Sequence, residues 1–167
     1  YKGKKIIFSL GRLVNYKGYR YLINAASFLP TDYVILIGGE GPLKKELQEM
    51  IVQCKLTSKV ELLGYLTDDE LYSYYKTCDL YCLSSIEKTE AFAIVQIEAM
   101  SYSKPIIATN IPESGVSWVN AHGFSGINVS IRDSKALADA FQYIVGNDEI
   151  YDKLVEGARN RYEEVFT

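Results

Sequence analysis

Short apolar runs alternate with longer amphipathic stretches along the whole chain. The runs are rich in Val, Ile and Leu, which is typical of parallel strands buried on both faces of a sheet. They cover residues 5–10, 33–38, 59–64, 79–85, 104–109 and 125–130. The stretches predict helices at residues 17–29, 42–55, 67–76, 92–103, 134–145 and 149–165. This order predicts an α/β fold, a Rossmann-like, doubly wound parallel sheet of about six strands flanked by helices.

Composition limits the class of protein and its partners. The 167 residues, 48% of them hydrophobic, are enough for one core and one domain over residues 1–167. A formal net charge of −3 without a basic cluster argues against nucleic-acid binding. No apolar run approaches the roughly 18 residues of a membrane span, and the three cysteines lack metal-site spacing. The three cysteines also cannot all pair in disulfides, which fits a reducing compartment, so we expect a cytoplasmic domain without a metal.

Candidate binding chemistry follows the first and fourth predicted strands. If the strand order is 3-2-1-4-5-6, the loops at residues 11–18 and 84–92 meet at the switch point, where doubly wound sheets bind ligands. Gly11 ends the first strand, Arg12 follows it, and Lys17 comes just before or at the start of the next helix. A guanidinium and an ammonium suit the oxygens of a diphosphate. The alternative is a pair of solvated loop cations.

A glycine-rich turn follows the second predicted strand. Gly38, Gly39 and Gly41 allow close backbone approach, and the next helix would present free N–H groups to an anion. A dinucleotide-binding domain would instead carry G-x-G-x-x-G after its first strand. That turn has only Gly11 and Gly18, so an NAD domain is the weaker interpretation. A purely structural glycine turn remains the alternative.

Residues 89–100, TEAFAIVQIEAM, predict an apolar helix with Glu90 at its amino-terminal end and Glu98 two turns inside. A carboxylate among apolar side chains is costly unless a partner satisfies it, which makes Glu98 a candidate ligand contact. A glutamate on the helix surface is the alternative. Gln96 and Glu98 should point to nearly opposite sides. The two glutamates would lie roughly 12 Å apart, beyond the ~5–9.5 Å of a glycosidase acid pair, yet able to hold two ends of one extended ligand.

His122 and Trp118 each allow two interpretations. His122, in the turn-like sequence NAHG, is either a turn residue or a neighbour of a bound nucleotide or sugar. Trp118 is either a packing anchor or a platform for base stacking. We favour the structural role for both.

Taken together, these motifs resemble the carboxy-terminal domain of the group 1 retaining glycosyltransferases, which have the GT-B fold. The resemblance rests on the two glutamates of EAFAIVQIE, on AMSYSKPIIAT after them, and on GRLVNYKG and GGEGPL upstream. It covers nearly the whole chain. SSIEKTEAFAIVQIEAM and SGVSWVNAHGFSG are most similar to the bacterial branch that adds mannose, rhamnose or similar sugars to surface polysaccharides, lipopolysaccharide among them.

The resemblance implies an activity and its partners. A hexose would pass, with retention and without a metal or cofactor, from a GDP- or UDP-linked sugar to a glycan or lipid-linked acceptor. The acceptor would bind an amino-terminal domain that this sequence lacks, so the chain alone is expected to be inactive. The full-length protein would be cytoplasmic or peripheral on the inner face of the membrane.

The resemblance also implies roles for matching residues. Arg12 and Lys17 would neutralise the diphosphate of the sugar donor. Glu90 and the backbone of residues 91–93 would hold the sugar hydroxyls and phosphate, and Glu98 would accept hydrogen bonds from the ribose hydroxyls. The implied catalytic residues are Arg12, Lys17 and Glu90, and the implied donor-binding residues are Gly11, Gly39, Glu90, Ala91, Phe92, Ala93, Ile94 and Glu98.

The chain departs from the family pattern at positions where glycine is usual. Ala91 and Ala93 flank the first turn of the predicted helix, and Ser103 precedes Lys104-Pro105. Extra methyl groups at Ala91 and Ala93 would either narrow the sugar pocket or tilt the backbone N–H groups, and both effects bear on the choice of donor. Two other functions remain as alternatives: another GT-B enzyme, such as a phosphorylase or a nucleotide-sugar epimerase, and a non-catalytic nucleotide-binding module.

Overall fold

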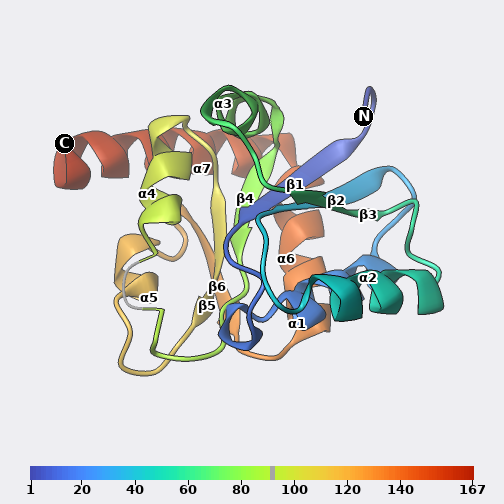
Figure 1. Cartoon of the computed structure of the whole chain (residues 1–167). Coiled ribbons are helices and arrows are strands. Elements are labelled where there is room, and N and C mark those ends of the chain that lie inside the picture. Colours follow the sequence, from blue (N-terminus) through green and yellow to red (C-terminus); the bar gives the residue numbers. More distant parts are fainter. Residues whose placement is uncertain (91–92) are drawn as a thin grey trace.

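The computed structural model describes residues 1–90 and 93–167. Its sheet is parallel and has the order β3-β2-β1-β4-β5-β6, so the predicted reversal between β1 and β4 is confirmed (Figure 1). The strands are β1 (Lys5–Leu10), β2 (Tyr33–Gly38), β3 (Val60–Gly64), β4 (Leu80–Leu83), β5 (Ile106–Asn110) and β6 (Gly126–Ser130).

Helices connect the strands and cover both faces of the sheet. The α-helices are α1 (Tyr19–Ala25), α2 (Lys44–Gln53), α3 (Asp68–Thr77), α4 (Ile94–Ser101), α5 (Val116–Val119), α6 (Ser134–Val145) and α7 (Asp148–Arg161). Shorter helical turns are η1 (Asn15–Lys17), η2 (Ala26–Phe28) and η3 (Tyr162–Phe166). Within the described part of the chain, no helix is long and apolar enough to cross a bilayer.

Successive residues of the central strands point to opposite faces and supply two separate cores. Ile7 packs in the core that includes α1, α2 and α6, whereas its neighbour Phe8 packs in the core that includes α3, α4 and α5. Ile35 and Leu36 divide in the same way. Figure 1 shows these two groups of helices on opposite sides of the sheet. Burial on both faces explains why these strands read as nearly continuous apolar runs.

The structure shortens several predicted helices and adds one. Lys17 ends the turn η1, and α1 begins only at Tyr19 because Gly18 adopts a left-handed φ of 68°. Helix α4 begins at Ile94 rather than at residue 92. The sequence does not predict α5, because its 4 residues are too few to show a helical repeat.

Helix α2 ends in a left-handed residue that is not glycine. Lys55 is exposed and has a φ of 57°. The N–H groups of Lys55 and Leu56 donate to the carbonyls of Val52 and Ile51, which is the pattern of a Schellman motif. Because left-handed backbone costs most residues about 1–2 kcal/mol, we expect Lys55→Gly to raise the free energy of unfolding by about 1 kcal/mol.

Denaturant unfolding measures this change. The matched variant Gln48→Gly, at an exposed position inside the same helix, is expected to lower the free energy of unfolding by about 1 kcal/mol. Equal effects of the two substitutions would contradict the role assigned to the left-handed backbone.

Candidate functional site

The loops that follow β1 and β4 are in direct contact at the switch point. Gly18 lies so close to the β4 loop that a Cβ atom there would be 2.1 Å from the carbonyl oxygen of Ser84. The Ser84 hydroxyl donates to the carbonyl of Lys17 at 2.9 Å, and the Ile86 N–H donates to the carbonyl of Tyr16 at 2.8 Å. Glycine at position 18 therefore allows the β1 loop to hold Lys17 beside the β4 loop.

The loops that follow β1 and β2 are joined in a similar way. Gly39 has a φ of 123°, and a Cβ atom there would lie 2.0 Å from the carbonyl oxygen of Gly11. The Leu13 N–H donates to the carbonyl of Glu40 at 2.9 Å. Gly11 and Gly39 thus have a structural role in the packing of these loops, and their contact with a ligand stays a prediction.

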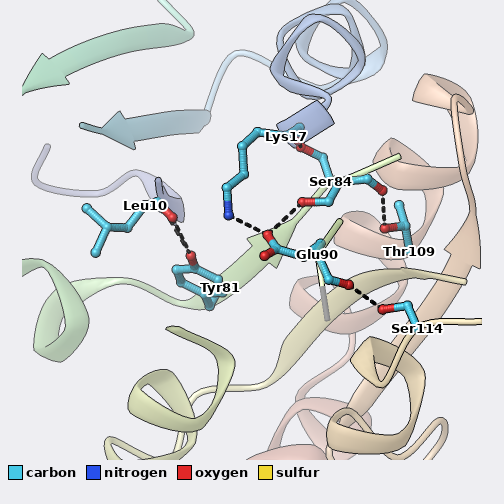
Figure 2. A network of polar contacts seen from close by, with 8 residues as sticks. Leu10, Lys17, Tyr81, Ser84, Glu90, Thr109 and Ser114 are labelled. Atoms are coloured by element: carbon cyan, nitrogen blue, oxygen red, sulfur yellow. Dashed lines mark hydrogen bonds and ion pairs between the residues drawn. The ribbon is translucent and has the colours of Figure 1, made fainter. Parts of the chain in front are cut away.

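Lys17 and Glu90 form a nearly buried ion pair between the two switch-point loops. Nζ of Lys17 contacts Oε1 of Glu90, and the two side chains are only 11% and 10% exposed. The Ser85 hydroxyl donates to the same carboxylate oxygen at 2.9 Å. Figure 2 shows the Lys17 side chain pointing toward Glu90. Each charge in such a desolvated pair depends on the other, because removal of one partner leaves the second without compensation.

Hydrogen bonds from β5 and from the β5–α5 loop hold Glu90 in place. The Ser114 hydroxyl donates to the carbonyl oxygen of Glu90, and the Thr109 hydroxyl donates to the carbonyl of Ser85 (Figure 2). Ser85 and Thr109 are both buried. The carboxylate and the chain that carries it are therefore supported by neighbouring segments, as in a preorganised binding site.

Arg12 and Ile94 are exposed at the same edge of the sheet. Arg12 directly follows the end of β1, and within residues 1–90 and 93–167 it joins no ion pair. Ile94, the first residue of α4, is 70% exposed. Both side chains are accessible to a ligand at the carboxyl ends of β1 and β4.

The prediction that Glu98 is a buried charge is wrong. Its side chain is exposed, whereas Gln96, which points to another side of α4, is fully buried. Because α4 begins at Ile94, Glu98 lies about one turn inside the helix and Glu90 lies outside it. The predicted helical separation of the two glutamates therefore does not apply. An exposed carboxylate needs no ligand to offset desolvation, so the energetic reason for assigning Glu98 to a ligand is lost.

Glu98 instead faces a cavity between α3 and α4. The Tyr75 hydroxyl donates to Oε2 of Glu98 at 3.0 Å. The cavity has a volume of about 250 Å³ and is lined by Asp68, Leu71, Tyr72, Tyr75, Glu98, Ser101 and Tyr102. Lys17 and Glu90 are not among its lining residues. A ligand that contacts both glutamates must therefore extend from the switch point to this cavity.

Two predicted contacts, Ala91 and Phe92, lie outside the described residues. Ala93 precedes α4 with a φ of 55°, and Ser103 follows it with a φ of 60°. Both are left-handed conformations that favour glycine, the residue that the family resemblance leads us to expect there. These departures from the family pattern therefore place side chains on strained backbone.

His122 and Trp118 make the contacts expected of structural residues. Nδ1 of His122 accepts a hydrogen bond from the N–H of Asn128 at 3.0 Å, which ties the turn to β6. Trp118 is 56% exposed, but its ring meets Phe166 edge-on with 5.8 Å between centroids. The Arg161 guanidinium lies over the same indole at 5.2 Å. These contacts favour the packing interpretation of both residues.

Metal-binding side chains do not gather anywhere in the described residues, where no group of His, Cys, Asp and Glu suits a metal ion. Cys54, Cys78 and Cys82 are free thiols. Burial raises the pKa of Cys78 to about 12, so this thiol is protonated at neutral pH.

Sequence reasoning missed the hydroxyl groups that support the two glutamates. Ser85 and Thr109 are polar residues at the carboxyl ends of predicted strands, and that position could have marked them. Ser114 and Tyr75 carry no local signal, because their glutamate partners are 24 and 23 positions away in the sequence. Only the folded arrangement brings these pairs together.

Comparison with known proteins places this chain in one family. The sequence profile described as "Glycosyl transferases group 1" matches residues 1–161. The chain is 33% identical over 167 residues to O-antigen chain mannosyltransferase C of Escherichia coli, covering 99% of this chain and 43% of that protein. It is 28% identical over 165 residues to the D-rhamnosyltransferase WbpZ of Pseudomonas aeruginosa, covering 99% and 42%. The chain thus spans less than half the length of these relatives.

Solved structures share the fold. The Anabaena protein Alr3699/HepE, in complex with UDP, has a TM-score of 0.90 at 23% identity over 98% of this chain and 45% of that one. A glycosyltransferase from Rickettsia africae ESF-5 has a TM-score of 0.86 at 26% identity over 100% of this chain and 45% of that one. The family match, the relatives and the fold together show that the chain belongs to the group 1 glycosyltransferases, of the GT-B type.

Proposed function

We propose that this chain is the donor-binding domain of a glycosyltransferase that moves a hexose from a GDP- or UDP-linked sugar to a glycan or lipid-linked acceptor. The observation that carries the proposal is the Lys17–Glu90 pair at the switch point, with Arg12 exposed on the same loop. The two cations match the oxygens of a diphosphate, and a carboxylate accepts hydrogen bonds from sugar hydroxyls.

Lys17 would contact the diphosphate while remaining close to Glu90. An ammonium group has three N–H donors, so its contact with Glu90 leaves donors for a phosphate oxygen. Negative charge builds on the diphosphate as its bond to the sugar breaks. Cations fixed beside that charge stabilise the transition state without reorganising, and this is our basis for a mechanism without a metal ion.

Glu90 would orient the sugar rather than act as a free nucleophile. Its Oε1 atom is engaged by Lys17 and Ser85, and its carbonyl oxygen by Ser114. A carboxylate held in this way suits hydrogen bonding to sugar hydroxyls. Retention of the anomeric configuration is part of the proposal and rests on the family resemblance.

Acceptor binding is proposed for a part of the full-length protein outside this chain, since the curated relatives are more than twice as long as the region they share with it. Their names, which include an O-antigen chain, support a glycan or lipid-linked acceptor. We propose that the full-length protein meets such an acceptor at the inner face of the membrane, and that the present chain alone transfers no sugar.

A panel of nucleotides tests donor binding and its independence from metal. GDP, UDP, ADP and dTDP are added to the chain, first with EDTA and then with Mg²⁺, and the melting temperature is recorded. We expect GDP or UDP to raise the melting temperature in EDTA. When the nucleotide is at a hundred times its Kd, its binding adds about 2.7 kcal/mol to the free energy of unfolding. Stabilisation that appears only with Mg²⁺ would refute metal independence, and no stabilisation by any nucleotide would refute the function.

Three further outcomes separate the alternatives in the full-length protein. A phosphorylase would bind inorganic phosphate, and an epimerase would convert its sugar nucleotide without an acceptor. A protein that binds a sugar nucleotide tightly but consumes none would be a binding module.

A further inference from the structure

A cavity beside α1 is separate from the Lys17–Glu90 pair. It lies between the first turn of α1, the start of α2, the β4 loop and the loop that joins β6 to α6, and we call it the α1 cavity. Its volume of about 360 Å³ is within the ~300–1,000 Å³ of ligand pockets. Lys17 and Glu90 do not line it. The residues that do include Asn15, Gly18, Arg20, Leu47, Ile86 and Arg132.

The α1 cavity is positively charged. Among the described residues that line it are two arginines and no acidic residue. Nη2 of Arg20 lies 3.6 Å from Oε1 of Glu46, which is too long for a hydrogen bond, so the N–H donors of this guanidinium remain available to a ligand. Arg132 joins no ion pair in the part of the chain that the structure describes. The neighbouring carboxylate of Asp133 instead accepts the N–H of Ala136 at 2.9 Å and caps α6.

Hydrogen bonding fixes the segments that carry the two arginines to each other. Helices α1, α2 and α6 pack in one core on the same side of the sheet (Figure 1). The Ser134 hydroxyl, at the start of α6, donates to the carbonyl of Tyr21 in α1 at 2.8 Å, and Ser134 is only 9% exposed. This contact joins the loop of Arg132 to the helix of Arg20, so the two guanidinium groups belong to one site.

Arg132 has a backbone conformation that favours glycine. Its φ of 56° is left-handed, and most residues adopt that conformation only at a cost that glycine avoids. Residues held in such conformations cluster at functional sites. The chain therefore places a second cation beside the α1 cavity at the expense of local backbone strain.

We infer that the α1 cavity binds a phosphate or diphosphate group that does not belong to the sugar donor. The planar guanidinium groups of Arg20 and Arg132 each offer paired N–H donors, which match the oxygens of a phosphate. The site uses none of the residues assigned to the donor, so it goes beyond the proposed function. Both a soluble phosphate compound and the head group of a lipid-linked diphosphate carry this chemistry.

Isothermal titration of pyrophosphate into the chain saturated with UDP tests the inference, because UDP already occupies the proposed donor site. We expect one pyrophosphate to bind each chain. Arg20→Ala combined with Arg132→Ala should weaken this binding by at least about tenfold, since charged hydrogen bonds are lost. The affinity for UDP should change by less than about threefold, because neither arginine is assigned to the donor.

Two matched controls separate recognition by the arginines from a general effect of charge. Lys2→Ala combined with Lys153→Ala removes the same charge from exposed positions that do not line the cavity, and it should change pyrophosphate affinity by less than about twofold. Arg20→Lys combined with Arg132→Lys keeps the charge but loses the planar fork. This variant should bind pyrophosphate about threefold more weakly than the wild-type chain.

Arg132→Gly separates a loss of binding from a loss of folding. Glycine relieves the left-handed backbone, so the melting temperature should rise. The same change removes one guanidinium and should weaken pyrophosphate binding by about fivefold. A variant that is more stable than the wild-type chain cannot lose affinity through unfolding.

Vesicles distinguish the two sources of the phosphate group. Phosphatidylcholine vesicles with and without a polyprenyl diphosphate are sedimented with the wild-type chain and with the Arg20→Ala/Arg132→Ala variant. Retention that needs both the diphosphate lipid and the two arginines assigns the site to a lipid-linked ligand. Binding of pyrophosphate without such retention assigns it to a soluble phosphate compound.

Three results would overturn the inference and leave the proposed function standing. They are the absence of pyrophosphate binding to the UDP-saturated chain, unchanged binding in the Arg20→Ala/Arg132→Ala variant or in Arg132→Gly, and an equal loss in the Lys2→Ala/Lys153→Ala control. Failure of the chain to bind UDP refutes the proposed function instead. Pyrophosphate binding that depends on Arg20 and Arg132 would then still support the site in the α1 cavity.

Discussion

Replacing Arg12 and Lys17 together by alanine is expected to weaken the binding of UDP or GDP by at least about 3 kcal/mol, which is more than about a hundredfold in Kd. Lys17 is nearly buried, so its charge is poorly screened by water and salt. Arg12 is exposed, so its contribution to the binding free energy should fall as added salt shortens the screening length to about 8 Å near physiological ionic strength. Isothermal titration in EDTA at low and high salt measures both contributions.

The matched control removes the same charge from another exposed surface. Lys2→Ala combined with Lys153→Ala, before β1 and within α7, changes the net charge equally and should alter the Kd by less than about threefold. Lys17→Ala leaves Glu90 without its cation. The single variant Arg12→Ala is therefore also measured, because it removes a cation and keeps the buried pair intact. Unchanged affinity in the Arg12/Lys17 variant, or an equal loss in the control, would rule out the proposed diphosphate contact.

Gly18→Ala is expected to lower the free energy of unfolding by about 3 kcal/mol or more, the largest stability change among our predictions. Two penalties combine at this position. The φ of 68° is unfavourable for alanine, and the added Cβ atom would lie 2.1 Å from the carbonyl oxygen of Ser84. Backbone on both sides must move to relieve that contact, so nucleotide binding should weaken along with stability. Denaturant unfolding gives the free energy.

Gly123→Ala isolates the first of these penalties. Gly123 has a φ of 78°, and a Cβ atom there would meet nothing within 4 Å. The substitution should therefore cost only about 1–2 kcal/mol, the ordinary penalty of left-handed backbone. Similar costs at positions 18 and 123 would show that the two switch-point loops can separate freely, contrary to the close packing described above.

Most of the fold could be predicted from the sequence because the strands are buried on both faces. The segments 5–10 and 33–38 are observed as β1 and β2 with unchanged bounds, since their apolar residues serve two cores at once. The helix ends were harder to predict. Left-handed backbone at Gly18 and Ala93 delays α1 and α4. Glycine favours that conformation, whereas alanine does not, so nothing local to the sequence signals the late start of α4.

The candidate site was predictable in outline but not in its environment. Lys17 and Glu90 are expected near each other once the strand order is known. Their direct ion pair depends on side-chain conformations, which residue spacing in the sequence does not determine. The error over Glu98 has a definite cause. The side of α4 that packs against the core carries Gln96, Ala99 and Met100, whereas Glu98 lies on the other side together with the exposed Ile94.

The backbone contacts among the switch-point loops also bear on how such a domain could be redesigned. Gly18 and Gly39 accept no side chain without moving a neighbouring carbonyl, so a mutational library that varies them would sample mostly destabilised proteins. Arg12 in the β1 loop and Ile94 at the start of α4 are exposed instead. A library intended to change sugar-nucleotide preference should therefore diversify exposed positions of this kind and keep the glycines constant.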